Sequence, residues 1–418
     1  MNILKIKNRK EVFSWCLYDF ANQPFTTIIV TFLYGAFFVD TIAENNKIGT
    51  TLWTFAISAT AIIVSLLSPI LGAIADSGGY RKYFLMFFTY STVFFTLLLY
   101  FPQEGDVFFA LLFFIIANIS FELGTVFCNS YLTDISNKMS IGTVSGFSWG
   151  LGFFGGLLAF LIAFIIFPDL DVNSHSVRKI NLLVGAWFLI FSIPTFLFLK
   201  DQKRIKFHYS HLRDSISSIR STFRDISNYK IIFNFLLARI FYNDALVTIF
   251  ALGGIYAVGT LDFSLLEVMK LGIVLNLSAA IGSFIFGIVE DRIGVKKVIN
   301  ITLVVLIIST LLAIIAPETN FPKQLFWLAG ILIGFMVGPN QSSSRSLMSR
   351  LTPKEKNNEF FGFYAFAGKA TSFLGPFLFG LITSLFNQQI ALWVVVFLFL
   401  IGFLLFNKIK FNKESFIN

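Results

Sequence analysis

The chain has 418 residues, of which 56% are hydrophobic and only 13% are charged. Soluble globular proteins carry about 25% charged residues, so this chain has too few charges to cover a water-facing surface, and we exclude a soluble protein. A net charge of +9 suggests a nucleic-acid-binding protein in a soluble chain, but here it follows from membrane topology, and no nucleic-acid partner is expected. Cys16 and Cys128 lie in apolar runs, which predicts neither a disulfide framework nor a metal site.

Twelve apolar stretches are long enough to cross a bilayer, which takes about 20 residues in a helix. In chain order they occupy residues 14–41, 49–75, 83–101, 107–133, 142–167, 181–199, 231–258, 265–289, 298–316, 324–349, 358–385 and 389–407. The first follows a basic N-terminal segment, as a signal peptide would, but it contains Asp19 and Pro24 and lacks a small-residue cleavage site. We therefore expect an uncleaved first span.

The basic residues predict the orientation of these spans. With the N-terminus inside, 24 of the 32 Lys and Arg residues fall on the cytoplasmic side, four fall outside and four lie within spans. This bias places both termini in the cytoplasm. A composition rich in Phe, Ile, Lys and Asn indicates a prokaryote with an AT-rich genome, so we expect the protein in the cytoplasmic (inner) membrane.

An internal repeat divides the spans into two groups of six. GAIADSGGYRK, which begins at Gly72, matches GIVEDRIGVKK, which begins at Gly287, at an offset of 215 residues. A second match, of Gly146-Phe147 with Gly362-Phe363, has an offset of 216 residues. Parallel repeats of six spans are typical of the major facilitator architecture. We therefore predict an all-α membrane protein with twelve transmembrane helices in two six-helix bundles, residues 1–199 and 230–418.

The segment between the bundles, residues 200–229, is polar but has one apolar stripe. Leu212, Ile216, Ile219, Phe223 and Ile226 follow each other at intervals of four, three, four and three residues. This spacing predicts an amphipathic helix on the inner membrane surface or against the bundle.

Several polar and charged residues lie at membrane depth, where a charge costs roughly 2.5–3.5 kcal/mol unless it faces a cavity or a partner. Most are on spans 1, 4, 7 and 10, which line the central cavity in the inferred architecture. The predicted substrate or proton site comprises Asp19, Asn22, Glu122, Arg239, Asn243, Asp244, Arg345 and Lys369. Glu267 and Lys270 are three residues apart near the outer end of span 8, and we expect them to pair with each other.

The cavity charges suggest two hypotheses. The first half supplies acidic residues and the second half supplies Arg239 and Arg345, so a zwitterion can bridge them with its ammonium on Asp19 or Glu122 and its carboxylate on an arginine. Alternatively, Glu122 carries a coupling proton. A structural ion-pair network is the competing interpretation of the same residues.

Four sequence blocks resemble a known family. YDFANQPF (Tyr18–Phe25), GAIADSGGYRK, RIFYNDALVTIFALGGIY (Arg239–Tyr256) and SRSLMSRLTP…EFFGFYAFAGKATSFLGP (Ser344–Pro376) are similar to the vacuole-effluxer-like family of major facilitator transporters, which includes autophagy-related vacuolar amino-acid effluxers of fungi. The chain departs from that pattern at Gln23-Pro24, and the proline there predicts a kink in span 1.

The resemblance implies a twelve-helix fold, alternating access and a cytoplasmic gate. Gate residues of the first half are then Gly72, Asp76, Arg81 and Lys82, and those of the second half are Gly287, Asp291 and Arg292. Asp134 and Arg350 end spans 4 and 10 at matching positions, so either can complete a gate ion pair. Asp76 is expected to interact with the positive N-terminus of span 11.

We therefore predict a monomeric secondary transporter that moves a small polar solute, with an amino acid as the leading candidate and protons as a candidate coupling ion. A drug or metabolite exporter of the same fold is the alternative. A membrane sensor is less favoured because no signalling domain is visible. No clustered nucleophile, metal set or ATP-binding loop is visible either, so we expect no enzyme activity and no cofactor.

Overall fold

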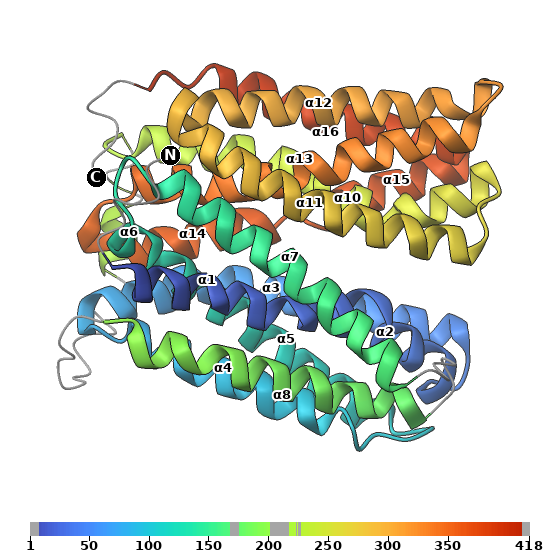
Figure 1. Cartoon of the computed structure of the whole chain (residues 1–418), viewed down its shortest axis with the longest axis horizontal. Coiled ribbons are helices and arrows are strands. Elements are labelled where there is room, and N and C mark those ends of the chain that lie inside the picture. Colours follow the sequence, from blue (N-terminus) through green and yellow to red (C-terminus); the bar gives the residue numbers. More distant parts are fainter. Residues whose placement is uncertain (1–7, 168–174, 201–216, 223, 225–226, 412–418) are drawn as a thin grey trace.

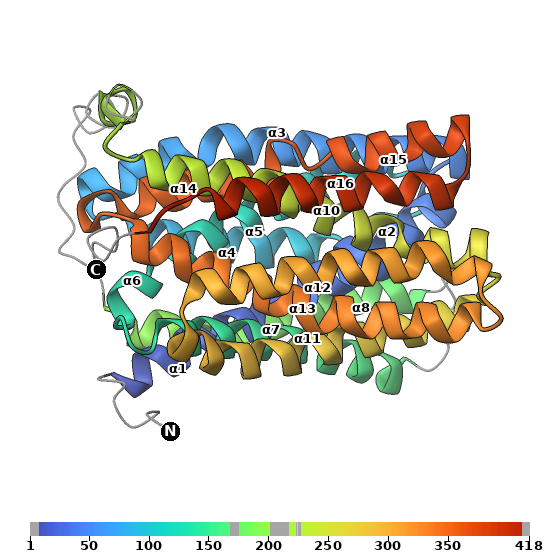
Figure 2. The ribbon, with the colours of Figure 1, turned by 90° about the horizontal axis from the view of Figure 1, so that it is seen from above.

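The computed structural model describes residues 8–167, 175–200, 217–222, 224 and 227–411. These residues form an elongated bundle of long helices whose axes run along the length of the molecule (Figures 1 and 2). Among them, eleven helices are long and apolar enough to cross a membrane. The twelfth span is α4 (Arg81–Leu98), an 18-residue helix that begins with two basic residues. The predicted twelve-span fold is therefore confirmed.

The first six spans are drawn in blue to green in Figure 1. They are α1 (Arg9–Pro24) with its continuation η2 (Phe25–Phe32), α2 (Tyr34–Phe37) and η3 (Phe38–Ile42), then α3 (Asn46–Gly78), α4, α5 (Val107–Ser130) with α6 (Leu132–Ile135), α7 (Ile141–Ile166) and α8 (His175–Phe198).

The last six spans are drawn in yellow-green to red. They are α10 (Lys230–Leu261), α11 (Leu265–Ile293), α12 (Val295–Ile315) with η4 (Ala316–Glu318), α13 (Pro322–Leu351) with η5 (Lys354–Lys356), the broken span α14 (Asn357–Lys369) and α15 (Leu374–Leu385), and α16 (Gln388–Asn407).

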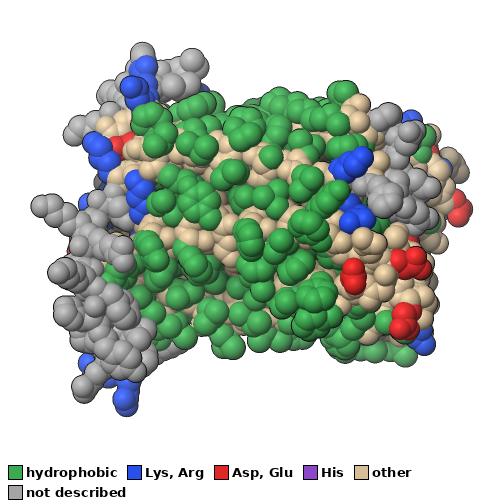
Figure 3. Space-filling view, turned by 90° about the horizontal axis from the view of Figure 1, so that it is seen from below, with side chains coloured by type: hydrophobic (Ala, Val, Ile, Leu, Met, Phe, Trp, Pro, Cys, Tyr) green, Lys and Arg blue, Asp and Glu red, His purple; other side chains and the backbone are tan. Residues whose placement is uncertain are grey.

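Each set of spans has its own apolar core. One buried cluster joins residues between Val12 and Leu199, and another joins residues between Ile232 and Ile409 together with Val126. On the face drawn in Figure 3, hydrophobic side chains cover a broad central belt, and charged side chains gather toward the two ends. This distribution is what a lipid-facing surface requires.

Helix α1 begins and α16 ends at the same end of the bundle, on the left in Figure 1. We call this end the terminal end and the other the opposite end. Span 1 changes its helical geometry at the proline that predicts a kink. Pro24 is the last residue of α1, and the next eight residues form a π-helix. A proline lacks the N–H that would continue the regular hydrogen-bond ladder.

The structure contradicts one sequence expectation, on Glu267, and describes only part of another, the amphipathic stripe. Glu267 pairs with Lys323 at 3.0 Å and caps α11 through Ser264, so the expected pairing with Lys270 is wrong. The N-terminus of a helix attracts a carboxylate at its third position, and this fixes the Glu267 side chain away from Lys270. Of the predicted amphipathic stripe, Leu212, Ile216, Phe223 and Ile226 lie outside the described residues. Ile219 is half-buried against the core of the last six spans.

Candidate functional site

A cavity of about 420 Å³ lies between the two sets of spans. Seven of the eight predicted site residues line it, namely Asp19, Asn22, Glu122, Arg239, Asn243, Arg345 and Lys369. Asp244 does not. Successive residues of a helix point about 100° apart, so Asn243 faces the cavity while Asp244 is buried against α15, where it accepts a hydrogen bond from the Gly375 N–H at 3.2 Å.

The floor of the cavity, toward the terminal end, is an ion pair between the two halves. Arg345 of α13 donates from Nη1 to Asp19 of α1 at 2.8 Å and to Asn129 at 3.0 Å. Its Nε and Nη2 donate to the Oγ and carbonyl oxygen of Ser145 at 3.0 and 2.9 Å, and Ser148 donates to Asp19 at 2.5 Å. Arg345 is only 2% exposed, so both charges are desolvated and compensated within the protein.

Two tryptophans enclose this arginine. The guanidinium of Arg345 lies 4.6 Å from the ring centroid of Trp15 and 5.6 Å from that of Trp149. Attraction to the ring faces adds to the ion pair. Trp149 also lines the cavity, and its indole Nε1 is buried without a hydrogen-bond partner.

A second ion pair crosses the cavity. Lys369, the last residue of α14, donates to Glu122 of α5 at 2.6 Å. The Lys369 side chain is 34% exposed and the Glu122 side chain is 20% exposed, so this pair is more accessible to solvent than the pair at the floor. Both acidic residues of the cavity are therefore paired with cations from the other half.

Arg239 is the third cation of the cavity. Its guanidinium lies 3.7 Å from the ring centroid of Tyr364 and donates from Nη1 to the Tyr364 carbonyl oxygen at 3.0 Å. Among the described residues no carboxylate pairs with it, and its Nε is buried without a partner. Gly368 leaves room for this group, because a Cβ there would lie 2.8 Å from Nη1.

At the terminal end, Asp76 of α3 caps the first turn of α14. Its carboxylate accepts from the backbone N–H of Asn358 at 3.0 Å and of Glu359 at 2.8 Å, and from the Asn358 side chain at 2.7 Å. The helices touch because Gly72 has no side chain. A Cβ there would lie 2.3 Å from the Asn358 carbonyl oxygen.

The second half repeats this arrangement. Asp291 of α11 accepts from the backbone N–H of Gly142 at 2.9 Å and of Thr143 at 2.8 Å, at the start of α7. Gly287 allows the close approach of the two helices, since a Cβ there would lie 2.9 Å from the Gly142 carbonyl oxygen. Each half thus places one carboxylate on the positive N-terminus of a helix of the other half.

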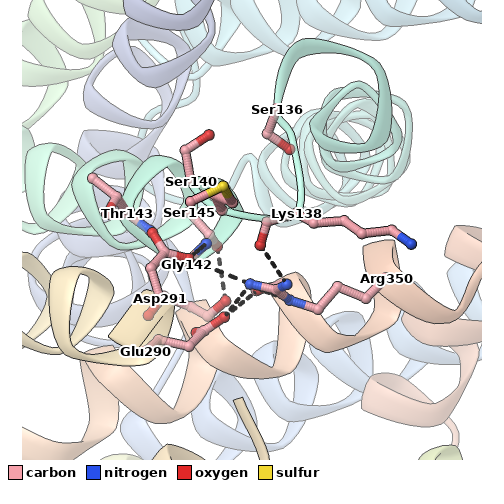
Figure 4. Close-up of polar contacts among 12 residues, drawn as sticks. Ser136, Lys138, Ser140, Gly142, Thr143, Ser145, Glu290, Asp291 and Arg350 are labelled. Carbon is pink, nitrogen blue, oxygen red and sulfur yellow. Dashed lines mark hydrogen bonds and ion pairs between the residues drawn. The ribbon is translucent and has the colours of Figure 1, made fainter. Parts of the chain in front are cut away.

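Ion pairs surround these caps. Arg81 pairs with Asp134 at 2.7 Å. Arg350 lies 3.4 Å from both Glu290 and Asp291, and it donates to the Lys138 carbonyl oxygen at 2.9 Å. Figure 4 shows its guanidinium between the two acidic residues and the loop before α7.

Two predicted gate residues lie apart from these contacts. Arg292 is exposed at the end of α11, and Lys82 donates to the Leu199 carbonyl oxygen at 2.7 Å within the first six spans. A residue that sequence reasoning missed, Glu290, contacts Arg350 and Ser346 instead. Glu290 is adjacent to Asp291, but nothing in the sequence distinguishes its buried position from an exposed one.

Other missed residues are neutral. Asn129, Ser145, Ser148 and Trp149 contact the charges of the cavity, and Asn358 helps to hold Asp76. Hydroxyl, amide and indole groups are common in any span, so only their contacts identify them.

Twelve spans around a charged cavity define a membrane transport protein of the major facilitator fold. Solved structures share this fold: the human organic anion transporter MFSD10 has a TM-score of 0.75 and 16% identity, covering 96% of this chain and 99% of that one. The proton:xylose symporter XylE has a TM-score of 0.74 and 14% identity, covering 95% of each chain.

The chain belongs to the vacuole effluxer Atg22-like family, whose model matches residues 47–142 and 133–415. An uncharacterized MFS-type transporter of Bacillus subtilis, YxiO, is 29% identical over an alignment 405 positions long, which covers 94% of this chain and 93% of that protein. Autophagy-related protein 22 of Pichia angusta is 23% identical over an alignment 451 positions long, gaps included, which covers 92% of this chain and 78% of that protein. The resemblance that the sequence blocks indicate is thus confirmed.

Proposed function

We propose that the protein is a monomeric secondary active transporter that carries a small polar solute through the central cavity by alternating access. The observation that carries this proposal is a charged cavity at mid-depth that is closed on one side by contacts between the two halves. Among the described residues, hydrogen bonds between the first six and the last six spans extend from the Glu122–Lys369 pair to the caps at Asp76 and Asp291.

Alternating access requires these contacts to break and to re-form in each cycle. The caps suit that role because each consists of a few hydrogen bonds between a carboxylate and a helix N-terminus, so the two states can lie within a few kcal/mol of each other. On this proposal the cavity is reached from the opposite end in the present state, and opening of the terminal end releases the solute on the other side.

The terminal end is proposed to be cytoplasmic and the membrane to be the inner membrane. The support is the excess of Lys and Arg in the loops at this end, which predicts a cytoplasmic location. Arg81, Arg350 and Lys356 lie here in the structure.

The solute is proposed to be small because the cavity holds about 420 Å³. An amino acid remains a candidate, and protons remain the candidate coupling ion with Glu122 as their carrier. Glu122 suits this role because protonation would release Lys369 and thereby loosen a contact between the two halves.

Reconstitution of the purified protein in liposomes tests the proposal. We expect time-dependent uptake of at least one radiolabelled small polar solute above protein-free vesicles. We also expect that the solute, when present on both sides, accelerates its own exchange. A protein that moves none of a broad panel, and whose terminal end never opens in spin-label distance measurements, would be a sensor or a structural protein instead.

A further inference from the structure

The charges that line the cavity do not balance. Two carboxylates, Asp19 and Glu122, face three cations, Arg239, Arg345 and Lys369. Two of the cations are consumed by the ion pairs at 2.8 and 2.6 Å. Arg239 remains, so the empty cavity carries one positive charge in excess.

The hydrogen-bonding atoms without a partner at the cavity also favour an anion. Two groups that line the cavity have buried nitrogen atoms without a partner, Nε of Arg239 and Nε1 of Trp149. Both atoms are donors only. A buried donor without a partner costs free energy, and an acceptor of the solute removes that cost when the side chain turns its donor toward the cavity. Arg239 is on α10 and Trp149 on α7, so the two donors come from different halves.

An ammonium group finds no carboxylate that is free of a cation. Both acidic residues of the cavity are paired with cations of the other half, so an ammonium would have to share a carboxylate with Arg345 or Lys369 and would be repelled by that cation. The uncharged wall is mixed. Polar side chains come from Asn22, Gln23, Thr26, Thr125, Asn129, Asn243 and Gln341, and a hydrocarbon body can pack against Phe121, Val126, Val247, Phe250, Phe361 and Ala365.

From this geometry we infer that the solute is a small organic monoanion, a carboxylate with an apolar body and no ammonium group, whose charged end binds Arg239. The inference rests on the proposed transport function and specifies its substrate. It replaces the zwitterion hypothesis drawn from the sequence, because the acidic residues which that hypothesis assigns to the ammonium are already paired.

The experiment measures binding of matched probes to the purified full-length protein by titration calorimetry. Leucine, 4-methylpentanoate and leucinamide share one carbon skeleton and carry, respectively, a carboxylate with an ammonium, a carboxylate alone and an ammonium alone. Parallel sets are built on alanine with propanoate and alaninamide, and on phenylalanine with 3-phenylpropanoate and phenylalaninamide. We expect the simple acid to bind at least tenfold more tightly than the amino acid in at least one set, and the amide not to bind.

Variants locate the carboxylate. Arg239→Gln should weaken binding of the acid at least tenfold, whereas Lys179→Gln, which removes an exposed charge of α8, should leave it unchanged. Trp149→Phe keeps the ring and removes only the donor, so it should weaken binding about threefold. If Arg239→Gln does not yield folded protein, binding of the acid to Trp149→Phe tests the inference by itself.

Three results would overturn the inference. The first is tighter binding of the amino acid or the amide in every set. The second is unchanged binding of the acid in both Arg239→Gln and Trp149→Phe, and the third is no binding of any probe. Counterflow in liposomes separates these results from failure of the transport proposal. If the same preparation exchanges another solute, only the substrate class is wrong, and if it exchanges nothing, the proposed function fails with it.

Discussion

The hydroxyl oxygens of Thr133 and Ser349 lie 3.0 Å apart, although the two residues are separated by 216 positions in the chain. That separation is the offset of the internal repeat, so these are equivalent positions of the two halves. Equivalent atoms can meet only near the axis that relates the halves, and the axis therefore passes between α6 and α13. The next residues, Asp134 and Arg350, have opposite charges and bind opposite partners, Arg81 in one half and Glu290 with Asp291 in the other. The residues that follow the equivalent pair thus differ in charge and in partner, whereas the caps Asp76 and Asp291 are equivalent in position and carry the same charge.

Asp76→Asn should weaken the closed terminal end. The amide keeps one acceptor oxygen but loses the charge and the second backbone hydrogen bond to α14. Loss of a helix cap costs about 0.5–2 kcal/mol, and 1.4 kcal/mol changes an equilibrium tenfold. We expect the open population to rise by about that factor, with a lower transport rate and little change in solute affinity.

Spin labels at Met139 and Lys354, which are both exposed, measure the opening as a distance distribution, after Cys16 and Cys128 have been replaced. Asp40→Asn changes a carboxylate at the opposite end and serves as the control. A variant that binds solute much more weakly but cycles at the normal rate would contradict a gating role for Asp76.

Gly72→Ala should prevent close contact of α3 with α14. The added Cβ would lie 2.3 Å from the Asn358 carbonyl oxygen and 2.7 Å from its carbon. Backbone atoms cannot move aside as a side chain can, and overpacking of this kind costs about 1–3 kcal/mol. We expect a longer distance between the same two spin labels.

Gly380→Ala is the matched control, because a Cβ at Gly380 meets no atom within 4 Å. The two variants make the same chemical change in a helix, so a difference between them reports the helix contact alone. Equal distance distributions in both would show that the contact at Gly72 does not hold the gate.

Glu122→Gln should abolish the pH dependence of transport if Glu122 carries the coupling proton. The amide resembles the protonated carboxyl and leaves Lys369 without its partner at 2.6 Å. The measurement is initial uptake in liposomes across a series of external pH values.

Lys369→Gln and the charge swap Glu122→Lys/Lys369→Glu separate coupling from structure. The single variants Glu122→Lys and Lys369→Glu should each lose transport, and the swap should recover part of it, with a coupling energy of about 0.5–3 kcal/mol. A pH profile that is the same in Glu122→Gln and the unaltered protein would assign the proton to another group.

Glu359→Ala should detach the linker from the gate. Glu359 is fully buried in the first turn of α14, and its carboxylate accepts from Ser218 at 2.7 Å and from Thr222 at 2.5 Å. A hydrogen bond to a charged group contributes about 1.5–3 kcal/mol. We expect amide hydrogen exchange at residues 217–222 to become at least tenfold faster.

Glu355→Ala is the control, since this exposed residue lies in the turn just before α14. It should leave exchange at residues 217–222 unchanged. Unchanged exchange in Glu359→Ala would mean that the apolar contact of Ile219, and not the hydrogen bonds, holds the segment.

The sequence by itself determined the number of spans, the fold and most of the residues that line the cavity. Spans are visible because the bilayer imposes a length and an apolar composition on each helix. Asp19, Glu122, Arg239, Arg345 and Lys369 are visible because a charge at membrane depth needs a cavity or a partner. The proline at residue 24 indicated where span 1 changes its geometry.

Only the tertiary structure decided which charges meet. Asp19 and Arg345 are 326 positions apart and Glu122 and Lys369 are 247 apart, and no local pattern relates such residues. The same holds for the burial of Asp244 against α15, for the contact of Glu290 in place of Arg292 with Arg350 and for the pairing of Glu267 with Lys323. Packing of twelve helices sets these distances, and they leave Arg239 as the cation without a carboxylate partner among the described residues of the cavity.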